Sequence, residues 1–130
     1  ANIAFNDQQK LSQLNAIVHP AVFADGDQWH QQQTDVPYTL KEAALLFESG
    51  GYRQMDKMIT VFAPEELRIQ RVVKRDDTSE KQIRQRIAKQ MPDEEKIKLA
   101  DYIIYNDGQQ ALIPQVLEIH QKLKILADEL

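Results

Sequence analysis

The stretch MITVFAPEE, at residues 58–66, decides the fold because it joins a strand directly to a helix. Residues 58–62 are apolar and rich in β-branched side chains, which predicts a strand. Pro64 fits the first turn of a helix, and Glu65 and Glu66 place negative charge at the positive end of the helix dipole. The stretch therefore predicts a strand followed by a helix that runs to about Lys74.

Downstream of residue 76, helices and strands continue to alternate. Ser79 with Gln82 fits a capping box, which predicts a helix to about Gln90. The further predicted elements are a short helix from Pro92, a strand at 102–105, a turn at 106–108 and a helix at 110–127. The apolar stripe of the last helix contains Leu112, Val116, Ile119, Leu123 and Leu126.

Upstream of residue 58, we expect two helices and further strand. Asn6 or Asp7 is a candidate cap for a helix to about Val18, and Pro20 is expected to end it and to start a second helix at about 20–33. Residues 38–40 and 43–47 suggest a strand, although the Ala, Leu, Lys and Glu content keeps helix open for the second run. The whole pattern predicts an α/β fold with a parallel sheet flanked by helices.

Composition excludes several classes of protein. Hydrophobic residues make up 42% of the 130-residue chain, which is enough for a core, and a net charge of −4 argues against a nucleic-acid binder. The chain has no cysteine, so it has no disulfide framework. No apolar run approaches the roughly 20 residues that cross a bilayer, and no signal peptide is evident. We expect a cytoplasmic protein, and a start at Ala1 suggests that the sequence begins inside a longer polypeptide.

Positive charge is concentrated at residues 67–90. This segment has eight basic and three acidic residues, a net charge of +5, which leaves −9 for the rest of the chain. Arg68, Arg71 and Arg75 follow at helical spacing on one face. Such a row is often a solvated face, but guanidinium groups also bind phosphate bidentately. A row of arginines directly after a strand and a helix start therefore suggests phosphate binding.

Five short motifs in one order carry a family resemblance. The sequence has LNxIxHP at 14–20, LLFE at 45–48, RxxxRD at 71–76, RIxxQ at 86–90 and ADxIIxNxG at 100–108. Together they resemble the dephospho-CoA kinase family across about residues 5–127. Each motif is weak alone, and the ordered set is specific.

The resemblance implies a partial P-loop kinase fold. The family transfers the γ-phosphoryl group of ATP to the ribose 3′-hydroxyl of dephospho-CoA, the last step of coenzyme A synthesis. It implies one truncated kinase domain, with a helical CoA side at about 1–35, a core at about 36–64 and 100–130, and a lid at about 65–99. For the complete family enzyme it also implies ATP as co-substrate and Mg²⁺.

The resemblance also implies roles for the nucleotide end. Arg71 and Arg75 would reach the ATP phosphates when the lid closes, as the catalytic arginines of this chain. The alternative is that one of them only pairs with Asp76 or Asp77 and holds the hairpin together. Asn106 and Gly108 would form the adenine-side turn, or else an ordinary turn in which glycine supplies a positive φ.

Three further residues are substrate-binding candidates. By resemblance, Asn15 and His19 would lie on the acceptor side, although a histidine before proline is more often a capping or core residue. Glu48 would orient a magnesium-bound water or the acceptor, or else bond to backbone in the turn before Gly50. Asp101 is expected to fix the start of a strand rather than touch a ligand. No residue is assigned as a metal ligand, because His30 and His120 lack companions at metal spacing.

The phosphate-binding loop of this family is absent from the 130 residues. A P-loop requires GxxxxGK[ST], and the four glycines, Gly26, Gly50, Gly51 and Gly108, include none that precedes a lysine. In the family, this loop and a catalytic aspartate would precede Ala1. We therefore expect that the chain alone neither transfers phosphate nor binds ATP tightly.

The missing first strand leaves a structural expectation. In the family it lies between the strands matching 38–47 and 58–62, so both would have unpaired edges, and we expect association between copies. Small-molecule partners would be ATP and dephospho-CoA. The alternatives are a non-catalytic binding or assembly module that retains the fold, another nucleoside-phosphate kinase, and a phosphate- or RNA-binding hairpin at 67–90. The acidic remainder of the chain disfavours the last of these.

Overall fold

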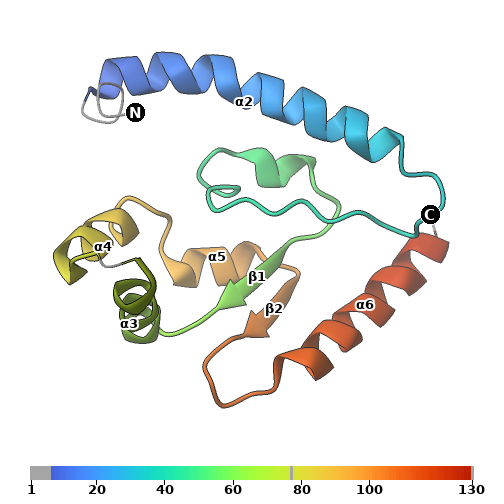
Figure 1. Ribbon diagram of the computed structural model, residues 1–130. Coiled ribbons are helices and arrows are strands. Elements are labelled where there is room, and N and C mark those ends of the chain that lie inside the picture. The colour runs from blue at the N-terminus through green and yellow to red at the C-terminus, as the bar shows by residue number, and fades with distance from the viewer. Residues whose placement is uncertain (1–6, 77, 130) are drawn as a thin grey trace. The chain divides into compact units, whose positions relative to one another are not determined.

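A computed structural model describes residues 7–76 and 78–129 of the chain (Figure 1). The chain divides into two units, Ala1–Lys41 and Glu42–Leu130. No helix within the described residues is both long and apolar enough to span a bilayer.

The first unit is built on one long helix, α2, at Gln8–Gln31. Asp7 is its N-cap, as predicted, and its Oδ1 accepts hydrogen bonds from the backbone N–H groups of Gln9 and Lys10 at 3.0 and 3.1 Å. The other candidate cap, Asn6, lies outside the described residues. The predicted break at Pro20 is wrong, because α2 continues through it. Proline has a helical φ and removes a single hydrogen bond, so it weakens the helix without ending it here.

After α2 the chain turns back along one face of the helix. Thr39 Oγ1 and His30 Nδ1 are hydrogen bonded at 2.8 Å, and the Lys41 ammonium lies 4.6 Å from the centroid of the Phe23 ring. Residues 38–40 have no strand structure, so that part of the predicted strand is wrong. Thr39 contacts a side chain of α2, and such a contact does not form a ladder of backbone hydrogen bonds.

The second unit contains the predicted parallel pair of strands. The strand β1 spans Ile59–Phe62, and β2 spans Tyr102–Tyr105. Ile59 pairs with Tyr102 and Phe62 with Tyr105, and the Phe62 and Tyr105 rings meet edge to face at 5.9 Å. In the described part of the chain this sheet has two strands. An α/β fold with a parallel sheet is thereby confirmed.

The apolar run at 43–47 is not a strand, contrary to prediction. Residues 44–50 form turns, followed by a short 3₁₀ helix, η1, at Gly51–Gln54. Local hydrogen bonds replace a ladder: the N–H of Ser49 donates to Leu45 O and that of Gly50 to Phe47 O. Gly50 has a φ of 77°, which suits glycine and reverses the chain. Leu46 and Phe47 are still buried, so burial was predicted correctly and the backbone form was not.

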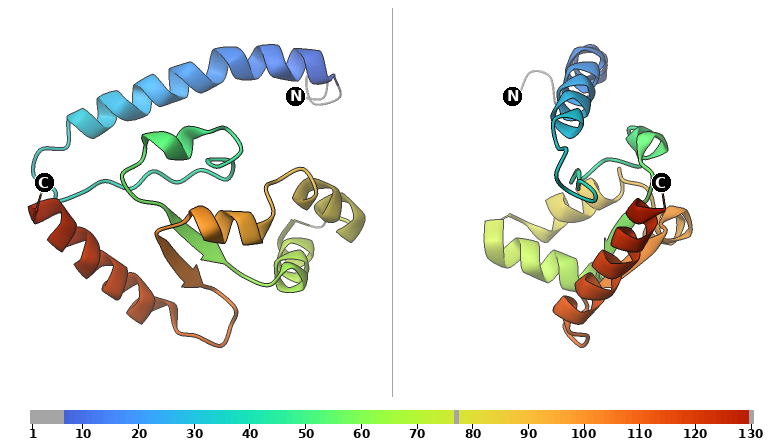
Figure 2. Two further views of the ribbon diagram at one scale, coloured as in Figure 1. Left: turned by 180° about the vertical axis from the view of Figure 1, so that it is seen from behind. Right: turned by 90° about the vertical axis from the view of Figure 1, so that its right-hand side faces the viewer.

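Four helices complete the second unit. The predicted lid contains α3 at Glu65–Asp76, α4 at Glu80–Ile87 and α5 at Asp93–Leu99, and α6 at Leu112–Asp128 follows β2. The helix α4 packs against α3, α5 against β1, and α6 against β2, and Figure 2 shows this from behind. The predicted apolar stripe of α6 is buried at Ile119 and Leu123, whereas Leu112 and Val116 are exposed.

The core of the second unit lies beside the root of the lid. Leu46, Phe47 and Met58 form a buried cluster, and Tyr52, Met55 and Met91 pack against it. The lid hairpin has a small core of its own, because Ile69 of α3 and Ile83 of α4 are 3% and 4% exposed. Met91 of the lid therefore packs against the buried cluster of Leu46, Phe47 and Met58, and Met58 directly precedes β1.

Candidate nucleotide site

Two of the predicted site residues come together where α3 meets the end of β2. Arg71 Nη1 donates a hydrogen bond of 2.9 Å to the backbone oxygen of Asn106. Asn106 is itself held to β1, because its N–H donates to Phe62 O at 2.7 Å. The predicted phosphate-binding arginine and the predicted adenine-side turn are therefore in direct contact.

Arg75 lies one turn beyond Arg71 and is held by its neighbour in the sequence. Its Nε and Nη2 donate to the two carboxylate oxygens of Asp76 at 2.5 and 2.8 Å. These hydrogen bonds lower the pKa of Asp76. The Arg75 side chain is 74% exposed, and exposed ion pairs contribute little free energy, so a phosphate group can compete for this guanidinium. Asp77, the other carboxylate considered, lies outside the described residues.

The turn after β2 is ordered by its own side chains. Asp107 Oδ1 accepts hydrogen bonds from the N–H groups of Gln109 and Gln110 at 2.8 and 3.0 Å. The bonds from Gln110 and Gln109 lower the pKa of Asp107, so this carboxylate stays charged at neutral pH. Gly108 has a φ of 82°, a conformation that side chains disfavour. Glycine is therefore needed for the turn itself, whatever the turn binds.

Glu48, the last residue of the LLFE motif, joins the turn segment at 44–50 to Met91 and to Lys96 of α5. Its Oε1 accepts the N–H of Met91 at 2.8 Å and pairs with Lys96 Nζ at 2.9 Å. The side chains of Glu48 and Lys96 are only 19% and 14% exposed. Burial raises the pKa of Glu48, but the Lys96 and Met91 hydrogen bonds outweigh it, so the pKa lies below its usual value. Glu48 thus bonds to backbone, although to that of Met91 rather than to the turn before Gly50.

Asp101 fixes the start of the sheet, as expected from the sequence. Its Oδ2 accepts the N–H of Met58 at 2.8 Å, and its Oδ1 binds Lys57 Nζ at 3.0 Å. The Met58 N–H in particular, and then Lys57, lower the pKa of Asp101 despite some burial. The backbone N–H of Asp101 also donates to Met58 O. Asp101 therefore helps to set the register in which β2 pairs with β1.

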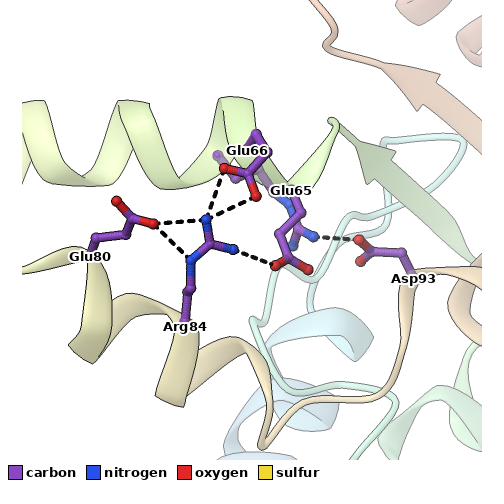
Figure 3. A network of polar contacts seen from close by, with 6 residues as sticks. Glu65, Glu66, Glu80, Arg84 and Asp93 are labelled. Atoms are coloured by element: carbon purple, nitrogen blue, oxygen red, sulfur yellow. Dashed lines mark hydrogen bonds and ion pairs between the residues drawn. The ribbon is translucent and has the colours of Figure 1, made fainter.

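The lid is braced by two arginines whose roles the sequence reasoning missed. Figure 3 shows the Arg84 guanidinium among three carboxylates, those of Glu65, Glu66 and Glu80, at 2.8–3.3 Å. Arg68 pairs with Asp93, which joins α3 to α5. The spacing of Glu80 and Arg84, one helical turn apart, was a readable signal. The partners on α3 and α5 depend on tertiary structure, so they could not be predicted from the sequence.

The two acceptor-side candidates lie in the first unit. Asn15 and His19 are four residues apart in α2, so they share a helix face. Asn15 is half-buried and His19 is exposed. The exposed His19 side chain is accessible from the surface of this unit.

The residues described do not form a metal centre by themselves. No three or more His, Asp or Glu side chains converge within the described part of the chain. Magnesium in kinases is held by one or two carboxylates together with substrate phosphates, so an all-protein site is not required. At this corner the Arg71 guanidinium lies beside an ordered turn, and Arg75 follows one helical turn further along α3.

Comparisons with a family profile and with curated proteins point to the same family. The dephospho-CoA kinase family profile matches residues 1–111. The dephospho-CoA kinase of Bacteroides fragilis is 42% identical over 130 residues, covering 97% of this chain and 63% of that protein. That of Aquifex aeolicus is 38% identical over 124 residues, covering 95% and 63%. The chain therefore spans less than two thirds of the length of these curated relatives.

Solved structures agree with the sequence matches. A dephospho-CoA kinase from Campylobacter jejuni superposes with a TM-score of 0.60 at 28% identity, over 98% of this chain and 63% of that one. A Thermus thermophilus protein superposes with a TM-score of 0.83 at 31% identity, over 94% and 63%. Both show that the fold of this chain occurs within larger structures.

Proposed function

Because the chain belongs to the dephospho-CoA kinase family, we propose that it supplies the lid and nucleotide end of an ATP-dependent kinase acting on the ribose 3′-hydroxyl of dephospho-CoA. The observation that carries this proposal is the contact between Arg71 and Asn106. This contact places the Arg71 guanidinium beside the turn at 106–108, which the family resemblance implies would bind adenine. A nucleotide lying along this corner would have its base at the turn and its phosphates toward α3.

The proposed mechanism of the lid is electrostatic. Charge on the transferred phosphoryl group is spread over its oxygens, and positive groups stabilise it. Arg71 and Arg75 lie one helical turn apart on α3, so a single movement of α3 carries both. Arg75 would release Asp76 and bind phosphate instead. Arg71 would likewise release the backbone oxygen of Asn106 and bind phosphate. Magnesium, when bound with ATP, would neutralise further phosphate charge.

We assign the acceptor side to α2. Asn15 and His19 are proposed to contact dephospho-CoA, because they share a face of that helix. Glu48 acts on the lid in this proposal, since its carboxylate is occupied by Met91 N–H and Lys96. The whole chain is then one part of a kinase domain, with the CoA side at about 1–35, the core at about 36–64 and 100–130, and the lid at about 65–99 between the two core segments.

Titration with ATP tests this function. We expect weak binding, with a dissociation constant of about 1 mM, because the chain has no P-loop. In ¹⁵N NMR spectra, shifts should concentrate at the amides of 106–108 and along 71–75. Equal or absent shifts across the chain at saturating ATP would contradict the proposal. GTP is the matched control ligand, because its phosphates are identical and its base differs.

A non-catalytic binding or assembly module is the second candidate. It is favoured by apolar side chains that the second unit exposes: Val61 of β1 is 60% exposed, and Ile113 and Leu117 of α6 are 73% and 54% exposed. Among the described residues β1 pairs with β2 alone, so its other edge is open. An open strand edge and exposed apolar side chains are both typical of an interface.

We propose that copies of the chain associate through this edge of β1. Light scattering over a range of concentrations is expected to show a dimer or larger species. Val61→Lys, which places a charge on the edge strand, should shift the mass toward the monomer. Lys124→Ala, an exposed change on α6, is the control and should leave the mass unchanged. A clean monomer at high concentration contradicts this association.

A further inference from the structure

Gln115 of α6 bonds to the strand that precedes the proposed nucleotide turn. Its Oε1 accepts the backbone N–H of Tyr105 at 2.8 Å, and its Nε2 donates to Tyr105 O at 3.1 Å. The same Nε2 donates to Ala111 O at 3.0 Å. One side-chain amide therefore contacts the residues on both sides of the loop 106–110.

The backbone N–H and C=O of Tyr105 both require hydrogen-bond partners on the side of β2 that faces away from β1. In a parallel pair, alternate residues direct both backbone groups to the same neighbour strand. Asn106 donates to Phe62 of β1, so the N–H and C=O of Tyr105 point to the opposite edge of β2. Gln115 takes both of these groups, as a further strand would.

The loop that Gln115 closes is ordered at three other points. Asp107 holds the N–H groups of Gln109 and Gln110, Gly108 supplies the positive φ, and Arg71 binds Asn106 O. These contacts set the interior of the loop. Gln115 is a side-chain contact that links its two ends.

We propose that Gln115 is a positioning residue that preforms the base-side turn for nucleotide binding. This rests on the proposed function, in which the turn at 106–108 meets adenine. Binding to a loop that is already ordered avoids the entropy of ordering it. Loss of Gln115 should therefore weaken recognition of the base, and leave the attraction of α3 for phosphate unchanged.

Gln115→Met is the test variant, and Gln121→Met is its control. Methionine keeps the length and the helix propensity of glutamine and removes both amide functions. Gln121 is an exposed glutamine on the same helix. Gln115→Glu is a second variant, because it keeps the acceptor for Tyr105 N–H and places an oxygen against two carbonyl oxygens. Circular dichroism is used to check that each variant folds.

Two measurements are made on the full chain. Amide hydrogen exchange without ligand is expected to be about tenfold faster at Tyr105 in Gln115→Met, and unchanged in Gln121→Met. NMR titration is then run with ATP and with inorganic tripolyphosphate. We expect about fivefold weaker ATP binding in both Gln115 variants. Tripolyphosphate binding should stay within about twofold of wild type.

The outcomes separate the inference from the function it rests on. Unchanged exchange at Tyr105 overturns the role of Gln115 in the loop. Faster exchange with unchanged ATP affinity also overturns it, because Gln115 is then structural only. If ATP and tripolyphosphate shift the wild-type turn equally, the base is not read there and the proposed function of the turn fails. The exchange result then still reports whether Gln115 orders the loop.

Discussion

The 130-residue chain alone is expected to transfer phosphate from ATP to dephospho-CoA at least about a thousandfold more slowly than a full-length relative. The reason is that no GxxxxGK[ST] occurs in it. Consecutive backbone N–H groups and the P-loop lysine hold the phosphates that are transferred, and the lid arginines act on a nucleotide already held there. Losing one preorganised donor alone costs about 10²–10³ in rate, and here a whole set is missing.

The measurement is coupled ADP release in the presence of dephospho-CoA and magnesium. A full-length relative, assayed in parallel at equal concentration, is the positive control. A reaction without dephospho-CoA corrects for background hydrolysis of ATP. Turnover within about tenfold of the relative would show that these residues suffice for catalysis, and the proposed division of labour would be wrong.

Glu48→Ala is expected to lower the free energy of unfolding by about 2 kcal/mol. The substitution leaves the Met91 N–H and the Lys96 ammonium without their acceptor, and the Lys96 side chain is only 14% exposed. Glu48→Gln should cost about 1 kcal/mol, because its amide oxygen can still accept from Met91. Urea unfolding measures both values from the shift in midpoint at constant slope.

Glu42→Ala is the matched control for Glu48, since Glu42 is an exposed residue of the same segment. It should change stability by less than about 0.5 kcal/mol. The pKa of Glu48 is lowered in the folded state, so its contribution is present above the unfolded pKa and is lost as pH falls through the folded value. The gap between wild type and Glu48→Gln should therefore narrow below about pH 4. An equal effect of Glu42→Ala would remove the assigned role of Glu48 at the root of the lid.

The sequence predicted elements well where local signals agree. The β-branched run before Pro64, the Ser79 cap and the turn at Gly108 each gave the observed element, because each depends on residues close in sequence. Residues 43–47 were predicted as strand because an apolar run shows burial and not backbone form. Helices were predicted on both sides of Pro20, but the pattern of residues does not show that the two are continuous, and proline was taken as the boundary between them.

The candidate site was predicted in part. The contact between Arg71 and Asn106 joins residues 35 apart, and the family motif brought both to attention without showing that they touch. Glu48 was a candidate from the family motif, but its partners in the structure, Met91 and Lys96, lie more than 40 residues away and could not be read from the sequence. Gln115 had no signal in the sequence, because glutamine on an amphipathic helix is ordinary on a solvated face.

Measured ATP affinity of Arg71→Ala, against Lys74→Ala as control, tests most directly the claim that α3 and the turn after β2 form a nucleotide site. Both substitutions remove one positive charge from exposed positions of the same helix, but Arg71 alone contacts Asn106. We predict about tenfold weaker ATP binding for Arg71→Ala and less than about twofold for Lys74→Ala. Equal losses in the two variants would mean that α3 attracts phosphate by net charge alone, and would contradict a nucleotide site at this corner.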